Sequence, residues 1–558
     1  MKNRIMNLIF LFSLHIPLTA FTILMISIIG FLINISINPS IIPISLVVSS
    51  TLLFFLTKKF RKKQNISTKN TIILFLIVLL FYIVATLFVA HFYDVSADGQ
   101  HYHQEAIIAM KQKHWNPLRS YNVPQGLHRI AKTWVQHYAK GSEIVSSAIY
   151  SFTQRIETAK VFNILFIFSS LLLAAYVFIN EFKFKVTESI LIAYALALNP
   201  VAIYQHLSFY IDGQIYSLIV TSIFLMIMYI RKKDNLYLIM FSIIICLLIN
   251  LKFTAILFAV VLCFALLFFM FFMKVFNCKK TILIGTILLL VGIVSIFLVG
   301  FNPYSYNTLK HKHPFYPLAG DSAINFMPEN TPNEYKPLNK IEKILASSFI
   351  LKTDGSKIIP RIPFNLTEWN FTFMQFTDIR VQGFGVFFME ISLLALLLYF
   401  YILFNKDYTN KHKVYLVSSA SIILLSCLII PESWWARYVP QMYILTILPV
   451  VFTFIFNKQN FLSKLVLFFL ILNSIYTVVA YVNAAHYNAN SINQSIMKLK
   501  EENRDIIILE NGAFYNNRIR LEENQIEYKV VDLQKWQEID KPTEIIFCES
   551  LFEVKYDD

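Results

Sequence analysis

Titratable side chains gather between residues 94 and 105 more densely than elsewhere in the sequence. The titratable residues are Asp94, Asp98, His101, His103 and Glu105, and the amides Gln100 and Gln104 lie among them. Carboxylates and imidazoles are the side chains that most often move protons in enzymes. A solvated loop start, in which Asp98 and Gly99 form a turn, explains the same residues without any chemistry. The stretch by itself leaves both interpretations open.

A second Asp-Gly-Gln sequence, at residues 212–214, repeats the one at residues 98–100. Each copy lies where an expected membrane-spanning helix meets a polar segment. A carboxylate at a membrane boundary is a candidate for function, whereas capping of the following helix is the structural alternative. We take Asp98, Asp94 and Asp212 as the candidate catalytic carboxylates.

Two cations are expected at the same membrane boundary as these aspartates. Lys252 lies between two apolar runs, and Arg437 lies in a short connector that also holds Trp434. Contact with lipid headgroups explains both cations and the tryptophan. Capture of a phosphate is the functional alternative, for which a guanidinium is well suited. His313, in an aromatic stretch of a later loop, is a candidate sugar contact or an ordinary packing residue.

The composition requires a membrane to position these residues. Of the 558 residues, 56% are hydrophobic and only 15% are charged, whereas soluble domains have about 25% charged residues. Many apolar runs reach the roughly 20 residues that a helix needs to cross a bilayer. The sequence predicts an α-helical polytopic membrane protein with about thirteen transmembrane helices. The expected spans are 8–35, 41–57, 71–91, 161–180, 187–204, 214–230, 236–251, 253–273, 281–301, 384–404, 414–431, 438–456 and 461–483.

The distribution of Lys and Arg gives the orientation. With Met1 in the cytoplasm, strict alternation places the short basic connectors, such as 58–63, 231–233 and 278–280, on the cytoplasmic side. This is the pattern of the positive-inside rule. The net charge of +15 therefore reports topology, and no nucleic-acid partner is expected. The first apolar run is too long for the core of a cleaved signal peptide and is expected to remain as a span.

Three divisions of the chain follow. Residues 1–70 form two N-terminal helices and a basic cytoplasmic loop, and residues 71–483 form the transmembrane core with extracytoplasmic loops 92–160 and 302–383. Within the first loop, residues 141–155 are expected to form an amphipathic helix at the membrane surface. Residues 484–558, with 15 acidic and 9 basic residues, are expected to form a small extracytoplasmic α/β domain.

The combination of acids, cations and an apolar setting suits the transfer of a group from a lipid phosphate to a hydroxyl acceptor. A carboxylate would take the proton of the acceptor, and Arg, Lys or a metal would hold the departing phosphate. The five cysteines lack the spacing of metal ligands.

The sequence resembles the GT-C superfamily of integral membrane glycosyltransferases, and more closely its bacterial members associated with surface polysaccharides. The resemblance covers roughly residues 71–450 and is carried by residues 94–104, 209–214, 250–254, 302–304, 313–317 and 434–440. It implies a polyprenyl-phosphate-linked sugar donor, inversion at the anomeric carbon and an active site at the outer leaflet, with a divalent cation in some members and none in others. Asp98 and Asp94 are spaced by four residues, so which of them is the base stays open.

The resemblance also implies roles for individual residues. Asp98 or Asp94 would be the base, and Asp212 a second acid that orients the acceptor or a metal. The substrate contacts would come from Gln100, His101, His103, Gln104, Glu105, Lys252, His313, Trp434 and Arg437. No cofactor is required beyond a possible divalent cation. The expected partners are the lipid-linked sugar, a glycan or lipid-linked acceptor of the cell envelope, and membrane lipids.

The expected location is the bacterial plasma membrane, with the site facing the extracytoplasmic side. An O-antigen-type polymerase or ligase is an alternative enzyme, although such a site would centre on arginines and a histidine in a late loop. A transporter or flippase is the alternative from another class. Transporters carry polar sites near the bilayer midplane, whereas the ionisable residues here gather at the outer ends of the spans.

Overall fold

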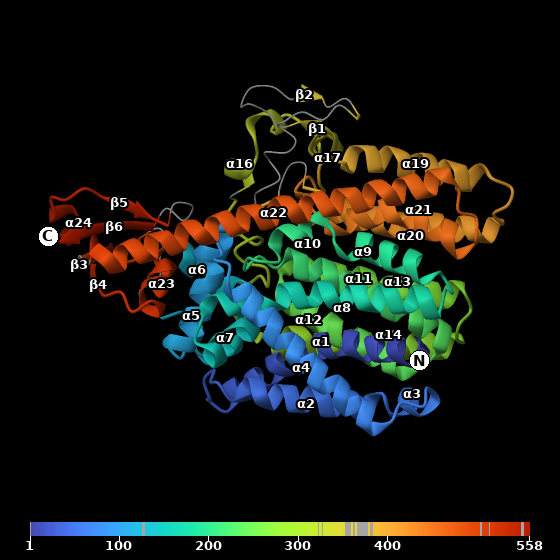
Figure 1. Ribbon diagram of the computed structural model, residues 1–558, viewed down its shortest axis with the longest axis horizontal. Coiled ribbons are helices and arrows are strands. Elements are labelled where there is room, and N and C mark those ends of the chain that lie inside the picture. The colour runs from blue at the N-terminus through green and yellow to red at the C-terminus, as the bar shows by residue number, and fades with distance from the viewer. Residues whose placement is uncertain are drawn as a thin grey trace.

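Apolar runs of the sequence form the helices of a bundle whose axes run along the long axis of the molecule (Figure 1). The computed structural model describes residues 2–124, 129–321, 323–325, 327–351, 359–360, 363–364, 378–379, 383–502, 505–512, 514–547 and 552–557. The chain is mostly helical in these residues, and a small sheet lies near the C-terminus. Cys548, the cysteine of the polar tail, lies outside the described residues.

Among the described residues, eight helices are long and apolar enough to cross a bilayer. They are α1 (Lys2–Leu32), α4 (Thr68–Ala90), α8 (Val161–Asn180), α11 (Asp212–Lys232), α13 (Phe253–Phe272), α14 (Cys278–Val294), α20 (Asn410–Ile429) and α22 (Phe461–Glu502). Shorter apolar helices occupy the other expected spans. They are α2 (Ile41–Leu56), α9 (Val186–Ala197), α12 (Asn235–Leu251), α19 (Phe388–Phe404) and α21 (Ile444–Ile455), with α10 (Pro200–Gln205) following α9.

The two ends of the bundle differ in character. The basic end carries α3 (Lys58–Lys63) and the connectors after α11 and α13, and it lies on the right in Figure 1. The loop end, on the left, carries residues 92–160 and the C-terminal sheet. The first of these segments folds into helices, namely η1 (Gly99–His103), α5 (Gln104–Gln112), α6 (Arg129–His137), α7 (Gly141–Thr153) and η2 (Ile156–Lys160).

Helix α7 corrects one expectation from the sequence. Residues 141–153 are helical, as expected, but residues 141–151 are all buried. The helix therefore packs inside the protein and does not lie on a membrane surface. Gly141 makes this packing possible, because a Cβ there would lie 2.7 Å from the backbone oxygen of Asn250 in α12.

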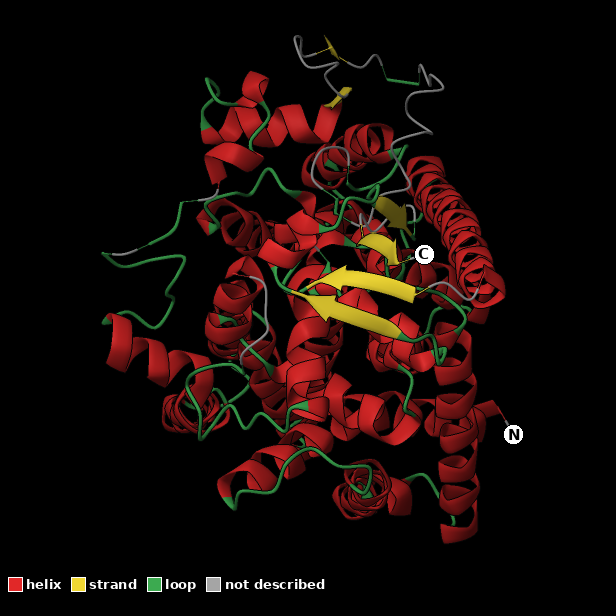
Figure 2. Cartoon of the chain, turned by 90° about the vertical axis from the view of Figure 1, so that its left-hand side faces the viewer, coloured by secondary structure: helices red, strands yellow, loops and turns green. Residues whose placement is uncertain are grey.

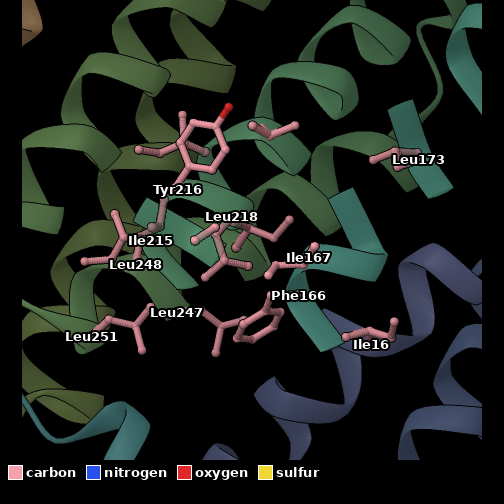
Figure 3. Close-up of a cluster of buried hydrophobic side chains, with 14 of the residues drawn as sticks. Ile16, Phe166, Ile167, Leu173, Ile215, Tyr216, Leu218, Leu247, Leu248 and Leu251 are labelled. Carbon is pink, nitrogen blue, oxygen red and sulfur yellow. The ribbon is translucent and has the colours of Figure 1, made fainter. Parts of the chain in front are cut away.

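Large apolar side chains fill the centre of the bundle, where α1, α8, α11 and α12 meet (Figure 3). Phe166, Leu218 and Leu247 are each less than 5% exposed. In a bilayer, lipid tails are as apolar as leucine, so close van der Waals packing and interhelical hydrogen bonds hold helices together. The hydroxyl of Ser169 in α8, for example, donates to the carbonyl of Ser13 in α1 at 2.7 Å.

Side chains that point away from this centre are also apolar. Leu80 of α4, Leu289 of α14 and Leu425 of α20 are each more than half exposed. A helix that is apolar on all sides is typical of a buried or membrane-embedded position. The exposed faces of these outer helices are therefore suited to lipid.

A polar network attaches the two N-terminal helices to the rest of the bundle. His15 of α1 lies with its Nδ1 2.9 Å from the Tyr82 hydroxyl of α4 and its Nε2 3.0 Å from the Ser50 hydroxyl of α2. Thr19 adds a bond to Ser49 of α2. A polar side chain at this depth needs such partners, because no water is present to satisfy it.

Residues 302–383 form short elements near the loop end where they are described. These are η4 (Phe301–Ser305), α15 (Tyr306–His311), α16 (Met327–Asn330), η5 (Asn333–Tyr335), α17 (Lys340–Phe349), β1 (Ile350–Leu351) and β2 (Ile359–Pro360). Helix α17 reaches the bundle through the hydroxyl of Ser347, which donates to the carbonyl of Trp434 at 2.5 Å.

Helix α22 runs for 42 residues and continues well beyond the span expected at 461–483. At 1.5 Å per residue it is about 63 Å long, roughly twice the thickness of a bilayer core. It leads to β3 (Asp505–Leu509), which pairs in parallel with β4 (Tyr528–Val531) and antiparallel with β6 (Phe552–Asp557). Strand β5 (Glu544–Ile546) completes the described order β4-β3-β6-β5. Figure 2 shows this sheet in front of the bundle. The same segment of the chain also holds η9 (Tyr515–Asn517), α23 (Arg518–Glu523) and α24 (Leu533–Glu538).

Glu523 joins this C-terminal domain, residues 505–557, to the loop end. Its Oε1 accepts a hydrogen bond from the backbone N–H of Ile156 at 2.7 Å. Burial raises the pKa of Glu523 from 4.5 to about 7. The folded protein therefore holds this proton more tightly than the unfolded chain. The resulting stabilisation is complete below the unfolded pKa and is lost as the pH rises through the folded pKa.

We therefore expect Glu523→Gln to flatten the dependence of stability on pH between about pH 5 and about pH 8. The glutamine keeps an oxygen that accepts from Ile156 but does not ionise. Thermal unfolding in detergent measures the effect, and the midpoint of the wild type should fall more steeply with pH than that of the variant. Glu527→Gln, at an exposed position of the same domain, should follow the wild type. Parallel curves for all three proteins would contradict the assignment.

Candidate functional site

The guanidinium of Arg437 lies between aspartates that come from distant parts of the chain. Its Nη1 donates to Asp98 Oδ2 at 3.1 Å and to Asp212 Oδ2 at 3.5 Å. Its Nε forms an ion pair with Asp378 Oδ1 at 2.9 Å. Asp98 directly precedes η1, Asp212 begins α11, and Arg437 lies in the single turn η7 (Ala436–Tyr438). The fold thus gathers these groups at the loop end of the bundle.

Lys252 joins the same group through Asp212. Its Nζ lies 2.5 Å from Asp212 Oδ1, and it sits 4.7 Å from the centre of the Tyr438 ring. The backbone of Lys252 is extended and separates α12 from α13. The break between these helices therefore delivers the ammonium group to the site. We call Asp98, Asp212, Asp378, Lys252 and Arg437 the aspartate–arginine cluster.

Asp212 does not cap helix α11. The residue that precedes α11 is Ile211, which forms no side-chain cap. The Asp212 oxygens instead accept from Lys252, from Arg437 and from Gln205, whose Nε2 lies 3.3 Å from Oδ2. Asp212 is therefore held for the cluster and not for the helix end.

Aromatic rings enclose the cluster. The Arg437 guanidinium carbon lies 4.8 Å from the Tyr210 ring centre, 5.1 Å from Trp435 and 5.2 Å from Tyr438. Such rings attract cations through their negative faces. They also exclude water, and charges interact more strongly where water is excluded.

The charges within the cluster do not balance. Counted at formal charges among the described side chains, the three carboxylates give −3 and the two cations give +2, which leaves −1. Burial raises the pKa of Asp98, but the charges of Arg437, His103 and Lys252 outweigh this and hold it below its ordinary value. Asp98 is therefore ionised at neutral pH.

The aspartates of the cluster differ in their access to solvent. The side chain of Asp98 is 30% exposed and that of Asp378 is 23% exposed, whereas those of Asp212 and Arg437 are 3% and 6% exposed. A reacting group from outside the protein can reach Asp98 most easily. Asp212 is placed instead to hold Lys252 and Arg437 in position.

Asp94 lies apart from the cluster. Its Oδ1 accepts from the backbone N–H of Ser96 at 2.8 Å, and its Oδ2 accepts from that of Phe209 at 3.0 Å. Burial raises its pKa, and the nearby charge of Lys160 offsets only part of the increase. The contact with Phe209 ties the first loop to the segment before α11, so these bonds give Asp94 a structural task.

The remaining candidates divide into two groups by location. His103 is buried beside the cluster, with its Nδ1 2.6 Å from Glu143 Oε1 in α7. Gln100, Gln104 and Glu105 face the C-terminal domain, and the His101 ring packs 6.1 Å from that of Phe514 in the same domain.

His313 and Trp434 are engaged elsewhere at the loop end. His313 Nδ1 accepts from the backbone N–H of Phe315 at 3.1 Å, within its own loop. The indole N–H of Trp434 donates to Glu432 at 2.7 Å, and its ring packs against Tyr335. Both residues therefore make contacts that hold the loops together, away from the cluster.

Sequence reasoning missed Asp378, Glu143 and Tyr210 as site residues. Asp378 stands in a long loop without a neighbouring motif, so the sequence gives no signal for it. Tyr210 lies within the stretch 209–214 that was singled out for Asp212, and its aromatic side chain beside that acid was an available signal.

The carboxylates of the cluster do not fit a metal ion. Their oxygens face Arg437 and Lys252, which take the place between them that a bound cation would need. Among the described residues, no group of three or more His, Cys, Asp or Glu side chains is arranged to hold a metal.

An apolar cavity of about 350 Å³ lies within the bundle. Its wall comes from α8, α9, α11, α13, α20 and α21 with the residues before it, and includes Gln441 near the loop end and Arg231 at the basic end. Along α11 the lining runs from Ile219 to Arg231. Those twelve steps correspond to about 18 Å of helix.

Comparison with known proteins gives no relative: no protein-family model matches the chain, and no curated protein matches it in sequence. The site is therefore interpreted from its own geometry.

A Cβ would be crowded at the glycine of both Asp-Gly-Gln sequences, and more severely at Gly99 than at Gly213. A Cβ on Gly99 would overlap Asp94 Oδ2 and Ser96 Oγ, and one on Gly213 would lie 3.0 Å from the backbone of Ala202 in α10. The glycines let the backbone beside each catalytic candidate pack closely. The repeated tripeptide thus has a shared physical reason.

We expect Gly99→Ala to destabilise the protein by about 1–3 kcal/mol, because the overlap forces the η1 turn and Asp94 apart. Gly292→Ala is the matched control, since a Cβ there meets nothing within 4 Å. Alanine favours a helix over glycine by up to about 1 kcal/mol, so the control should equal or exceed the wild type. Thermal unfolding in detergent compares the two, and equal midpoints would contradict this account of Gly99.

Proposed function

We propose that the chain is a membrane glycosyltransferase of the GT-C type, which moves a sugar from a polyprenyl-phosphate donor to a hydroxyl acceptor of a cell-envelope glycan. The observation that carries the proposal is the aspartate–arginine cluster. A partly exposed carboxylate, Asp98, lies next to two buried cations, Arg437 and Lys252. Glycosyl transfer from a phosphate needs a proton acceptor and a stabiliser of departing negative charge in one place.

The proposed reaction uses Asp98 as the base. The acceptor hydroxyl gives its proton to the Asp98 carboxylate while its oxygen forms a bond to the anomeric carbon. The bond between that carbon and the phosphate oxygen breaks, and the phosphate leaves with the electron pair. Arg437 and Lys252 stabilise the phosphate, and attack from the opposite side inverts the anomeric carbon.

Binding of the donor phosphate would also change the basicity of Asp98. Arg437 already contacts Asp98, Asp212 and Asp378, so an incoming phosphate has to replace a carboxylate. Asp98 is the most exposed partner and the easiest to displace. Once released from Arg437, its carboxylate loses the cation that lowers its pKa and becomes a stronger base. The base is then strengthened when the donor is present.

The cavity is suited to the lipid tail of the donor. Its wall is mostly apolar and extends from Gln441 to Arg231. Gln441 is only four residues from Arg437 in the sequence. An isoprenoid tail in this cavity would place its phosphate at the loop end, where the cations lie. Pockets of this volume are typical of small-molecule and cofactor sites.

The membrane arrangement completes the proposal. Thirteen crossings, made by the eight long helices and the five shorter ones, would place the loop end outside the plasma membrane of a bacterium. The basic connectors at the opposite end support this orientation. The described ionisable groups of the site lie at one end of the bundle, which supports transfer at a membrane surface over transport through the midplane.

We expect Asp98→Asn to lower sugar transfer by about 10²–10⁴-fold, because the amide cannot take up the proton. Mass spectrometry of surface glycans from cells that carry the wild type or the variant as their only copy measures the loss. Asp212→Asn should also lower transfer strongly, since it loosens the hold on Lys252 and Arg437. Asp407→Asn, at an exposed position of the basic end, should leave the glycans unchanged.

Normal glycans in both site variants, with all proteins present in the membrane at equal amounts, would remove the proposed function. Flux of a lipid-linked glycan in proteoliposomes without a covalent product would favour a transporter instead.

We expect Ala265→Phe to weaken the use of long-tailed donors by roughly tenfold, because the ring fills part of the cavity. Ala265 lies in α13 and lines the cavity. Val260→Phe is the matched control on the same helix, at a position that is 59% exposed and suited to lipid. Transfer from polyprenyl-phosphate sugars of long and short tails tests this. An equal loss for both tail lengths would contradict the role of the cavity.

A further inference from the structure

We propose that the C-terminal domain, residues 505–557, positions the loop that carries Asp98 and so takes part in catalysis without touching the reacting atoms. The inference rests on the proposed function for the role of Asp98. The structural basis of the inference is a set of buried polar contacts between residues 516–520 and the residues on either side of Asp98.

On the C-terminal side of Asp98, three contacts hold the turn η1 and the start of α5. Asn517 Nδ2 donates to Gln100 Oε1 at 2.9 Å, and Arg518 Nη1 donates to Glu105 Oε1 at 3.0 Å. Between them, Asn516 donates to Gln104. Three consecutive residues of the tail thus contact three residues within the six-residue stretch 100–105 of the loop.

On the N-terminal side, Arg520 holds the backbone of Asp94. Its Nη2 donates to the Asp94 carbonyl at 2.6 Å and lies 3.4 Å from Glu157 Oε1. Glu157 Oε2 in turn accepts from the backbone N–H of Asp94 at 3.0 Å. The loop is therefore fixed four residues before Asp98 and again two residues after it.

Burial makes these contacts specific. Asn516 and Asn517 are fully buried, Arg518 is 5% exposed and Arg520 is 2% exposed. Buried polar and charged groups are costly unless their partners are in place. A shift of the domain would leave several groups without partners, so one docked arrangement is strongly preferred.

Helix α22 brings the domain to this position. It runs without interruption from the bundle to Glu502, three residues before β3 begins. Its Asn493 accepts a hydrogen bond from the Tyr93 hydroxyl at 2.9 Å. Tyr93 directly precedes Asp94. The same stretch of loop is thus held by the helix and by the domain that the helix carries.

Residues 516–520 act as positioning residues, which hold the loop around Asp98 without touching its carboxylate. The bonds of residues 516–520 go to the neighbours of Asp98, whereas the described partner of the Asp98 carboxylate is Arg437. Displacement of a reacting group by about 1 Å can lower a rate by 10²-fold. Loss of the contacts should therefore affect the rate of transfer more than the amount of folded protein.

Asn517→Ala in the full-length protein is the first test. We expect transfer per molecule of folded protein to fall about 10- to 100-fold, with hydrogen exchange of residues 94–112 faster than in the wild type. Lys535→Ala, an exposed position of the same domain, should match the wild type in both measurements. Unchanged exchange and unchanged transfer in Asn517→Ala would overturn the proposal.

An exchange of charges gives the second test. Arg518→Glu and Glu105→Arg each bring like charges together and should each lower transfer and speed the exchange of residues 94–112. The double variant restores an opposite pair and should recover most of both losses. Failure of the double variant to recover either measurement would overturn the proposal.

The two measurements separate this inference from the proposed function. Hydrogen exchange reports the docking of the domain whether or not the protein transfers sugar. Faster exchange in the single variants with no transfer activity even in the wild type would remove the glycosyltransferase and leave the docking contacts in place, with no catalytic role for them. Faster exchange with unchanged transfer would reduce the contacts to a structural role and overturn the positioning claim.

Discussion

The burial of opposite charges around Arg437 is the constraint on which the rest of the structure depends. A guanidinium that is 6% exposed is tolerated only where carboxylates pair with it. Its described partners, Asp98, Asp212 and Asp378, come from segments that are more than a hundred residues apart. The chain can satisfy Arg437 only when those segments meet at one end of the bundle, so the charge pairing and the arrangement of the loops require each other.

Other features of the loop end serve this meeting point. Gly99 and Gly213 let the backbone pack closely beside Asp98 and Asp212. The long helix α22 carries a domain whose buried side chains hold the first loop. The apolar cavity extends along α11 from Ile219 to Arg231, with Gln441 in its wall. A polar site, the contacts that hold it and an apolar cavity thus occur in one fold.

The sequence predicts the helices well because bilayer thickness and apolar run length determine them almost alone. It also predicts an α/β fold for the polar tail, where the structure has a small sheet. It predicts less of the site. Asp98 and Asp94 look alike in sequence. The structure separates them, because Asp98 pairs with Arg437 whereas Asp94 accepts backbone bonds from Ser96 and Phe209. The pairing of Gln100, Gln104 and Glu105 with residues 516–518 spans more than 400 positions, which no local pattern can reveal.

The most direct measurement is an experimental structure of the protein with bound polyprenyl phosphate, by cryo-electron microscopy in a lipid nanodisc. The account predicts that the phosphate lies against Arg437 and Lys252, with the Asp98 carboxylate released toward the opening and the tail in the apolar cavity. A phosphate bound elsewhere, with Asp98 still paired to Arg437, would contradict it. So would a structure in which Asp98 and Asp212 lie far apart.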